Sequence, residues 1–362
     1  MSKHYLVTGG AGFIGTNYVA RLLRRNERVT IYDNLSRVGC PRNIKWLNDT
    51  FGKDAYCSVV GDVRDSKLLV DIVGDVDVIV HLAGQVAVTS SVKQPREDFE
   101  CNAIGTFNVL EAARLSGRHP VVLYASTNKV YGGMEDIQIV EAETRYQYAD
   151  YPWGVPETYP LNFHSPYGCS KGAGDQYMRD YYRIYGLPTV VLRQSCIYGP
   201  RQFGIEDQGW VAWLVIASIT NRSITIFGDG KQVRDVLYVD DLLNAYDAAI
   251  AQIDRSAGQI YNIGGGPANT ISIWREFGPI LTSILSQEIP IAEIDQASSG
   301  QANSFQTNYG KANYGDWRPG DQRVYISDIR KAERELDWTP QVSVENGIRR
   351  LVSWIQENRF LF

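Results

Sequence analysis

Thr8-Gly-Gly-Ala-Gly-Phe-Ile-Gly15 is the stretch that decides the fold of this 362-residue chain. It follows a short apolar run at 5–8 and opens a segment, 13–25, whose apolar residues recur at helical spacing. Glycines at positions 9, 10, 12 and 15 allow a tight turn from strand to helix. They also let backbone N–H groups approach a pyrophosphate at the positive end of that helix. The stretch therefore predicts a dinucleotide-binding strand–turn–helix unit.

Strand-like and helix-like segments alternate through the first half of the chain. Strands are expected at 28–32, 55–60, 76–81, 120–125 and 187–193, and helices at 66–73, 97–116 and 165–185. This alternation is typical of an α/β fold with a doubly wound (Rossmann) parallel sheet that carries helices on both faces. Residues 133–164, rich in aromatic residues and proline, are expected to form a long functional loop.

The second half changes character after Gly199-Pro200. Helices are expected at 209–219, 273–285, 327–336 and 344–357, and strands that return to the sheet at 234–239 and 259–263. We therefore expect a dinucleotide-binding domain at 1–200, joined again by the strands at about 234–263. A smaller α/β domain at 201–233 and 264–362 is expected to bind the substrate. The tract 296–316, rich in Gln, Asn, Ser, Gly and Tyr, is expected to be an inserted surface loop.

The composition excludes several classes of protein. A net charge of −5, with 44% hydrophobic and 21% charged residues, is ordinary for a globular chain. The chain lacks the basic footprint of a nucleic-acid binder and the Lys/Arg runs of a membrane-surface protein. The five cysteines form no CxxC pair and the four histidines show no metal-ligand spacing, so neither disulfides nor a metal are expected. Without a visible leader or an apolar run of about 20 residues, the sequence predicts a cytoplasmic protein.

Acidic residues end two of the expected strands. A carboxylate at Asp33 can accept both ribose hydroxyls of adenosine and repels a 2′-phosphate, which favours NAD over NADP. Arg37 is close in sequence and could serve such a phosphate. Asp62 could accept from the adenine amino group. The full set expected to bind the cofactor is Gly9, Gly12, Phe13, Ile14, Gly15, Asp33, Asn34, Ser36, Arg37, Asp62, Val63, Leu82, Ala83, Gly84, Gln85, Asn102, Tyr167 and Lys171.

Tyr167-Gly-Cys-Ser-Lys171 places a phenol and an ammonium one helical turn apart. A tyrosine with its usual pKa, about 10, is a poor base. A neighbouring ammonium and the positive nicotinamide ring both favour the phenolate, which can take a proton from a sugar hydroxyl as hydride leaves its carbon. Thr127, at the end of another expected strand, offers a hydroxyl that shares this proton. The predicted catalytic set is Thr127, Tyr167 and Lys171.

These motifs, in this order, resemble the extended short-chain dehydrogenase/reductase family. The resemblance rests on the glycine stretch, Asp33, Asp62, Tyr131-Gly132, Tyr167 with Lys171, and Arg234-Asp235, and it covers about 4–290 and 318–358. Residues 126–132 and 163–172 are similar to one group in that family, the 2-epimerases of CDP-sugars of the paratose and tyvelose type. The resemblance thereby implies deoxysugar biosynthesis for lipopolysaccharide O-antigen.

The resemblance implies an isomerase that inverts C2 of a CDP-hexose with tightly bound NAD. Tyr167 would remove a hydroxyl proton, NAD would take the hydride, and the keto sugar would turn before the hydride returns. A homo-oligomer, dimer or tetramer, is implied through the helices around 97–116 and 165–185. The implied substrate-binding residues are Gln85, Asn128, Cys196, Arg201, Gln232, Arg234, Arg318 and Asp321. Arg234 would hold the pyrophosphate, whereas Cys196, where relatives often have Asn, is a weaker partner.

Other functions could use parts of the same apparatus. A UDP-hexose 4-epimerase needs the same residues, because the carbon that reacts depends on how the loops orient the sugar. A sugar 4,6-dehydratase needs an acid/base pair, and related dehydratases carry Asp-Glu where this chain has Asn128-Lys129. A non-catalytic NAD-sensing scaffold would not require Thr127, Tyr167 and Lys171. Arg234 could instead form a surface ion pair with Asp235 or Asp240.

Overall fold

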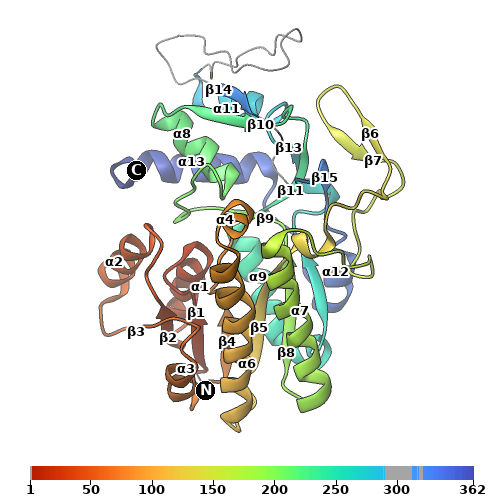
Figure 1. The fold of residues 1–362 in the computed structure, drawn as a ribbon. Helices are drawn as coiled ribbons and strands as arrows, with labels where there is room; N and C mark the ends of the chain where they lie inside the picture. Colours follow the sequence, from red (N-terminus) through yellow and green to blue (C-terminus); the bar gives the residue numbers. More distant parts are fainter. Residues whose placement is uncertain (1, 288, 290–311, 316, 318–320) are drawn as a thin grey trace.

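A seven-stranded parallel sheet forms the centre of the computed structural model, which describes residues 2–287, 289, 312–315, 317 and 321–362. The spatial order is β3-β2-β1-β4-β5-β8-β12. The strands are β1 (His4–Thr8), β2 (Arg28–Asp33), β3 (Cys57–Val60), β4 (Val78–His81), β5 (Val121–Thr127), β8 (Thr189–Gln194) and β12 (Ile260–Ile263). This is the doubly wound arrangement of a Rossmann sheet, so the predicted fold class is confirmed (Figure 1).

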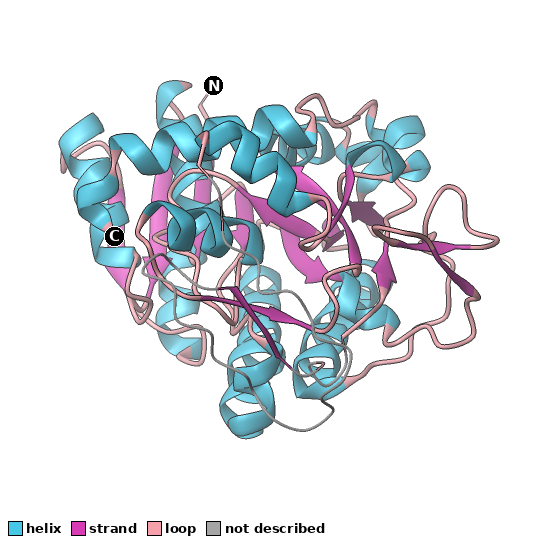
Figure 2. Cartoon of the chain, turned by 90° about the horizontal axis from the view of Figure 1, so that it is seen from above, coloured by secondary structure: helices cyan, strands magenta, loops and turns pink. Residues whose placement is uncertain are grey.

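Helices cover both faces of this sheet (Figure 2). The helices are α1 (Phe13–Arg24), α2 (Cys40–Phe51), α3 (Ser66–Val73), α6 (Gly105–Leu115), α7 (Ser165–Tyr185) and α9 (Val239–Ala251). Successive residues of β1 show why: Val7 packs in one core cluster with α1 and α9, and Leu6 packs in the other with α3, α6 and α7. Because both faces are buried, the strands read as continuous apolar runs rather than alternating ones.

A second layer lies beyond the carboxyl ends of the large sheet (Figure 1). It contains β9 (Cys196–Tyr198), β11 (Val233–Tyr238), β13 (Thr270–Ser272) and β15 (Val324–Tyr325) in one sheet, and β10 (Ile224–Phe227) with β14 (Ala312–Gly315) in another. Its helices are α8 (Trp210–Ile219), α11 (Phe277–Leu285) and α13 (Val344–Glu357), while α12 (Arg330–Leu336) packs against β12. No helix in the described part of the chain is long and apolar enough to cross a membrane.

Two predictions about the second half are wrong. The strand expected at 234–239 does not return to the large sheet, because β11 pairs with β9, β13 and β15. A strand that is buried throughout has the same pattern in either sheet, so its residues could not indicate its partners. Residues 312–315, expected to be loop, form β14 beside β10; the rest of the 296–316 tract lies outside the described residues. The proposed domain division stays a prediction.

The elements in the first half of the chain also differ in detail from those that the sequence pattern predicts. The expected loop 133–164 contains a hairpin of β6 (Ile139–Glu141) and β7 (Tyr146–Tyr148). The helix expected at 97–116 consists of α5 (Pro95–Phe99), a π-helical turn at Glu100–Ile104 and α6; α4 (Val88–Lys93) precedes it. Such π turns often accompany functional sites. Here the turn carries Asn102, whose side chain contacts Gln85.

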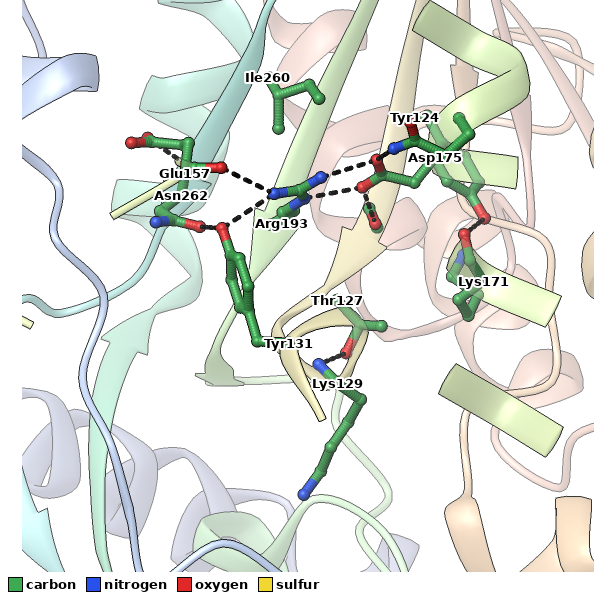
Figure 3. A network of polar contacts seen from close by, with 12 residues as sticks. Tyr124, Thr127, Lys129, Tyr131, Glu157, Lys171, Asp175, Arg193, Ile260 and Asn262 are labelled. Carbon is green, nitrogen blue, oxygen red and sulfur yellow. Dashed lines mark hydrogen bonds and ion pairs between the residues drawn. The ribbon is translucent and has the colours of Figure 1, made fainter. Parts of the chain in front are cut away.

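A buried ion pair connects the strands and helix that meet at the catalytic end of the sheet. Arg193 of β8 donates Nε to Asp175 Oδ2 (2.9 Å) and Nη2 to Asp175 Oδ1 (3.0 Å), with the two side chains 2% and 0% exposed. Arg193 Nη1 donates to the hydroxyl of Tyr131 (3.0 Å), and Asp175 also accepts from Ser126 of β5 (2.8 Å). Figure 3 shows the guanidinium lying between these partners. The network thus joins β5, β8, α7 and the turn after β5.

We expect Arg193→Met to lower the free energy of unfolding by about 3–5 kcal/mol, because it leaves the Asp175 carboxylate buried without its cation. Urea titration monitored by circular dichroism measures the change. The matched control is Arg349→Met, which removes an exposed pair with Glu345 on α13 and should cost less than about 1 kcal/mol. Equal losses in both variants would contradict this account of the buried pair.

Candidate active site

A cavity of about 770 Å³ lies between the carboxyl ends of the large sheet and the second layer. Its walls include the turn between β1 and α1, the ends of β2, β4, β5 and β8, and the first turns of α7 and α8. In doubly wound sheets, ligands bind at this edge of the strands. The cavity is therefore the candidate active site.

The glycine turn forms the end of the cavity at which a dinucleotide is expected. A Cβ on Gly15 would lie 2.3 Å from the carbonyl oxygen of Gly9, and a Cβ on Gly9, at φ +70°, would lie 2.7 Å from the backbone nitrogen of Ala83. Gly12 precedes α1 and offers no side-chain cap to its first N–H groups. Only glycines allow this close packing of backbone, and the open helix N-terminus suits a pyrophosphate. The turn therefore fits the dinucleotide that the sequence predicted.

Two carboxylates flank the expected adenosine site. Asp33, 8% exposed, accepts from the backbone N–H groups of Ala11 (3.0 Å) and Leu35 (2.8 Å), while burial raises its pKa. Asp62 accepts from the backbone and side chain of Arg64 and from Asn34, and the hydrogen bonds from Arg64 hold its pKa well below the usual range. These bonds use most of the acceptor capacity of Asp62, so the adenine contact stays a prediction.

The three predicted catalytic side chains meet on one wall of the cavity. Tyr167 and Lys171 lie on α7 and Thr127 ends β5; each is less than a tenth exposed. The hydroxyl groups of Tyr167 and Thr127 are hydrogen-bonded. Lys171 Nζ lies 4.1 Å from the centre of the Tyr124 ring, a cation–π contact. The side chains are therefore placed to handle the proton of one substrate hydroxyl.

Burial is the main influence on the protonation states of Tyr167 and Lys171. It raises the pKa of Tyr167 to about 12, while the hydrogen bond to Thr127 acts in the opposite direction. It lowers the pKa of Lys171 to about 8. We expected the ammonium of Lys171 to favour the phenolate, but the cation that lowers the pKa of Tyr167 is Arg37, and burial outweighs it. Removal from water penalises the charged forms of both Tyr167 and Lys171.

Six of the residues expected to bind the substrate line the cavity: Gln85, Asn128, Cys196, Arg201, Arg234 and Asp321. Arg234, 5% exposed, forms an ion pair with Asp321 (Nη2 to Oδ1, 2.5 Å) and not with Asp235 or Asp240. Cys196 Sγ accepts from Trp210 Nε1 (3.4 Å). The alternative of a surface ion pair for Arg234 is therefore wrong.

Two predicted contacts lie behind the cavity instead of on its surface. Asn102 accepts from the backbone N–H of Gln85 (2.9 Å) and donates to its carbonyl (3.0 Å), so it supports the turn after β4. Gln232 is fully buried and donates to the carbonyl of Phe227 (2.6 Å). Neither side chain lines the cavity, because each amide is engaged by nearby backbone. Arg318 lies outside the described residues.

The sequence reasoning missed several lining residues, above all Lys129 and Trp210. Lys129 follows Thr127 in the 3₁₀ turn Asn128–Tyr131, and Trp210 begins α8 after Gly209, whose φ is +73°. Asn128-Lys129 served only to distinguish groups within the family, so the position of Lys129 two residues after Thr127 was the signal that could have placed it at the cavity. Nothing in the local sequence placed Trp210 at the cavity. Among the described residues, no group of three or more His, Cys, Asp or Glu could hold a metal ion.

The glycine turn, Asp33 and the Thr127–Tyr167–Lys171 set on a doubly wound sheet define an extended short-chain dehydrogenase/reductase. The sequence profile of the GDP-mannose 4,6 dehydratase family matches residues 6–351. The chain therefore belongs to the NAD-dependent epimerase/dehydratase family.

Known relatives come from both the epimerase and the dehydratase sides of this family. The chain is 40% identical to CDP-paratose 2-epimerase of Salmonella typhi over 356 residues, which are 96% of this chain and 98% of the relative. The crystal structure of UDP-glucose 4-epimerase from Thermotoga maritima with UDP-glucose superposes with a TM-score of 0.79 at 29% identity, covering 98% and 99% of the two chains. DesIV, a dTDP-glucose 4,6-dehydratase of Streptomyces venezuelae solved with NAD, gives 0.79 at 30%, covering 99% and 98%.

We expect Gly15→Ala to purify with at least tenfold less bound dinucleotide than the wild type, because the added methyl group displaces the turn that receives the pyrophosphate. Release of NAD after acid precipitation, quantified by chromatography, measures the content. Gly74→Ala is the matched control, since Gly74 ends α3 with φ −48° and open space around it. Full NAD content in Gly15→Ala would contradict the assignment of the turn.

Proposed function

We propose that the chain inverts C2 of a CDP-hexose of the paratose or tyvelose type. As a member of the family, it is an isomerase that uses NAD. The single observation that carries the finer proposal is the composition of the cavity wall after Thr127. An intact Thr127–Tyr167–Lys171 set is followed by Asn128 and Lys129. The wall can thus transfer a proton at a sugar hydroxyl, and neither of the two residues that follow Thr127 is a carboxylic acid.

That wall argues against dehydration. Elimination of water from a hexose needs a general acid for the leaving hydroxyl and a base for the neighbouring carbon. Neither residue after Thr127 supplies a carboxyl group for these roles, and the amide of Asn128 does not exchange a proton at neutral pH. The 40% identity to CDP-paratose 2-epimerase of Salmonella typhi over nearly the whole chain points in the same direction.

The chain's own residues divide the work. Thr127 and Tyr167 would hold the reacting hydroxyl between them, and Tyr167, once ionised to the phenolate, would take its proton. Lys171 would supply positive charge beside that oxygen, and Gly9, Gly12 and Gly15 would seat the pyrophosphate of the cofactor. A bound NAD would supply reversible hydride transfer to and from the sugar carbon. Burial of the wall would keep water from the oxidised sugar.

The alternative of 4-epimerisation of a UDP-hexose has specific support from the structural likeness to the Thermotoga maritima enzyme. The same three catalytic residues would serve it, so the two functions differ in which carbon faces the phenol. A non-catalytic NAD-binding scaffold has less support, because it would gain nothing from burying Lys171 beside Tyr167. One experiment separates all three.

We expect the purified protein to invert C2 of CDP-paratose and to leave the C4 centre of UDP-glucose unchanged, as followed by proton NMR. With deuterium at C2 of the substrate, the product should keep the label, because the hydride returns to its own carbon. Tyr167→Phe should lower kcat by about 10²- to 10⁴-fold while keeping bound NAD. Exclusive inversion at C4 would overturn the 2-epimerase assignment, and turnover unaffected by Tyr167→Phe would overturn the catalytic role of the phenol.

We further propose that two copies of the chain associate through the outer face of the α5–α6 and α7 segments. Exposed apolar side chains gather on these helices: Phe99, Ile104, Phe107, Leu115, Tyr177, Tyr182, Ile184 and Tyr185. Phe107 stacks edge-on against Tyr177, so the two helices present one continuous apolar surface. A patch of this kind on a globular protein marks an interaction site.

We expect Phe107→Asp to shift the protein from dimer or tetramer to a smaller species in analytical ultracentrifugation, because a buried unpaired carboxylate would oppose association. Val140→Asp, an equally conspicuous exposed residue on β6, is the control and should leave the mass unchanged. An unchanged mass for Phe107→Asp would rule out this surface.

A further inference from the structure

Lys129 is a second lysine in the cavity, on the side opposite the cofactor end. It lies two residues after Thr127 in the 3₁₀ turn that begins where β5 ends. Figure 3 shows its side chain running away from the buried Arg193 network. The ammonium of Lys129 donates to Gln322 Oε1 (3.4 Å). Lys129 lines the cavity together with Cys196, Arg234 and Asp321.

The charges around Lys129 come from three different elements. Arg234 faces it from β11, Cys196 from β9, and Asp321 from the segment before β15. Arg234 opposes the positive charge of Lys129, whereas Asp321 and the Cys196 thiol favour it. Burial is the largest influence and lowers the pKa of Lys129 to about 8. Burying an ammonium costs free energy, so a buried lysine in a cavity indicates a site at which an anion binds.

The local charge balance shows what Lys129 adds. Arg234 and Asp321 already form an ion pair, so together they are neutral. A diphosphate that approaches Arg234 must therefore compete with the Asp321 carboxylate. Lys129, Arg234 and Asp321 together carry one net positive charge. Cys196, a weak hydrogen-bond partner already engaged by Trp210, cannot supply it.

We propose that Lys129 binds the diphosphate of the nucleotide-sugar together with Arg234, with its ammonium as the donor that Cys196 does not provide. This inference rests on the proposed function, because it assumes that a nucleoside diphosphate occupies this half of the cavity. The ligand class is a pyrimidine nucleoside diphosphate, and the recognised group is its phosphate. A charge-assisted hydrogen bond of this kind adds about 10- to 100-fold in affinity.

Binding through Lys129 is linked to protons. Below pH 8 the ammonium is charged and ready to bind, whereas above pH 8 the unliganded protein must first take up a proton. The diphosphate is already mostly ionised at pH 7 and gains little further charge up to pH 9. Affinity should therefore fall as the pH rises from 7 to 9, by about tenfold. Lys171 also titrates near pH 8 but stays in place in Lys129 variants, so the difference between proteins isolates Lys129.

The test titrates CDP into the NAD-loaded protein by calorimetry at pH 7 and pH 9, with UDP and cytidine as parallel probes. We expect Lys129→Met to weaken CDP binding about 10- to 100-fold at pH 7 and to lose most of its pH dependence. Lys129→Arg, which keeps a cation at all pH values, should bind CDP within about threefold of wild type at pH 7 and retain that affinity at pH 9. Cytidine, which has no phosphate, should bind all three proteins equally.

The results of this titration distinguish a failure of the inference about Lys129 from a failure of the proposed function. Unchanged CDP binding by Lys129→Met, or equal weakening of cytidine and CDP, overturns the inference and leaves the proposed function standing. If CDP binds as expected but no CDP-sugar is inverted, the proposed function is overturned and the inferred role of Lys129 stands. If neither CDP nor UDP binds the wild type, the proposed function and the inference about Lys129 are both overturned. If Lys129→Met does not fold, as judged by its NAD content, wild-type affinity that stays constant from pH 7 to 9 overturns the inference.

Discussion

The buried ion pair between Arg193 and Asp175 is the interaction on which the catalytic geometry depends. Asp175 lies one helical turn after Lys171 on α7, and its carboxylate also accepts from Ser126, the neighbour of Thr127. The pair thus fixes the helix that carries the phenol and ammonium against the strand that carries the hydroxyl. Isolated buried ion pairs add little net stability. Their value here lies in permitting one arrangement of β5, β8 and α7.

Burial then determines what the site can do. The cavity removes Tyr167 and Lys171 from water, which raises the pKa of the phenol to about 12 and lowers that of the ammonium to about 8. A phenol in this state stays protonated at neutral pH in the protein alone.

The two layers divide recognition between them. The large sheet presents the glycine turn and the wall of Thr127, Tyr167 and Lys171 at the carboxyl ends of its strands, where doubly wound proteins bind their ligands. The second layer contributes Arg234, Cys196 and Trp210 to the same cavity. The likeness to both epimerases and dehydratases at similar TM-scores shows that the scaffold is shared. Because a shared scaffold does not fix the chemistry, function has to be argued from the side chains of the site.

The sequence by itself determined the doubly wound sheet and the dinucleotide end, and it predicted the Tyr167–Lys171 pair, because each depends on residues close in sequence: glycines around one turn, a pair four apart on one helix. Only the tertiary structure decided the partners of β11, the pairing of Arg234 with Asp321, and the positions of Asn102 and Gln232 behind the cavity. These depend on contacts between segments tens to hundreds of residues apart, which no local period encodes. The protonation of Tyr167 belongs with them, since burial is a property of the whole fold.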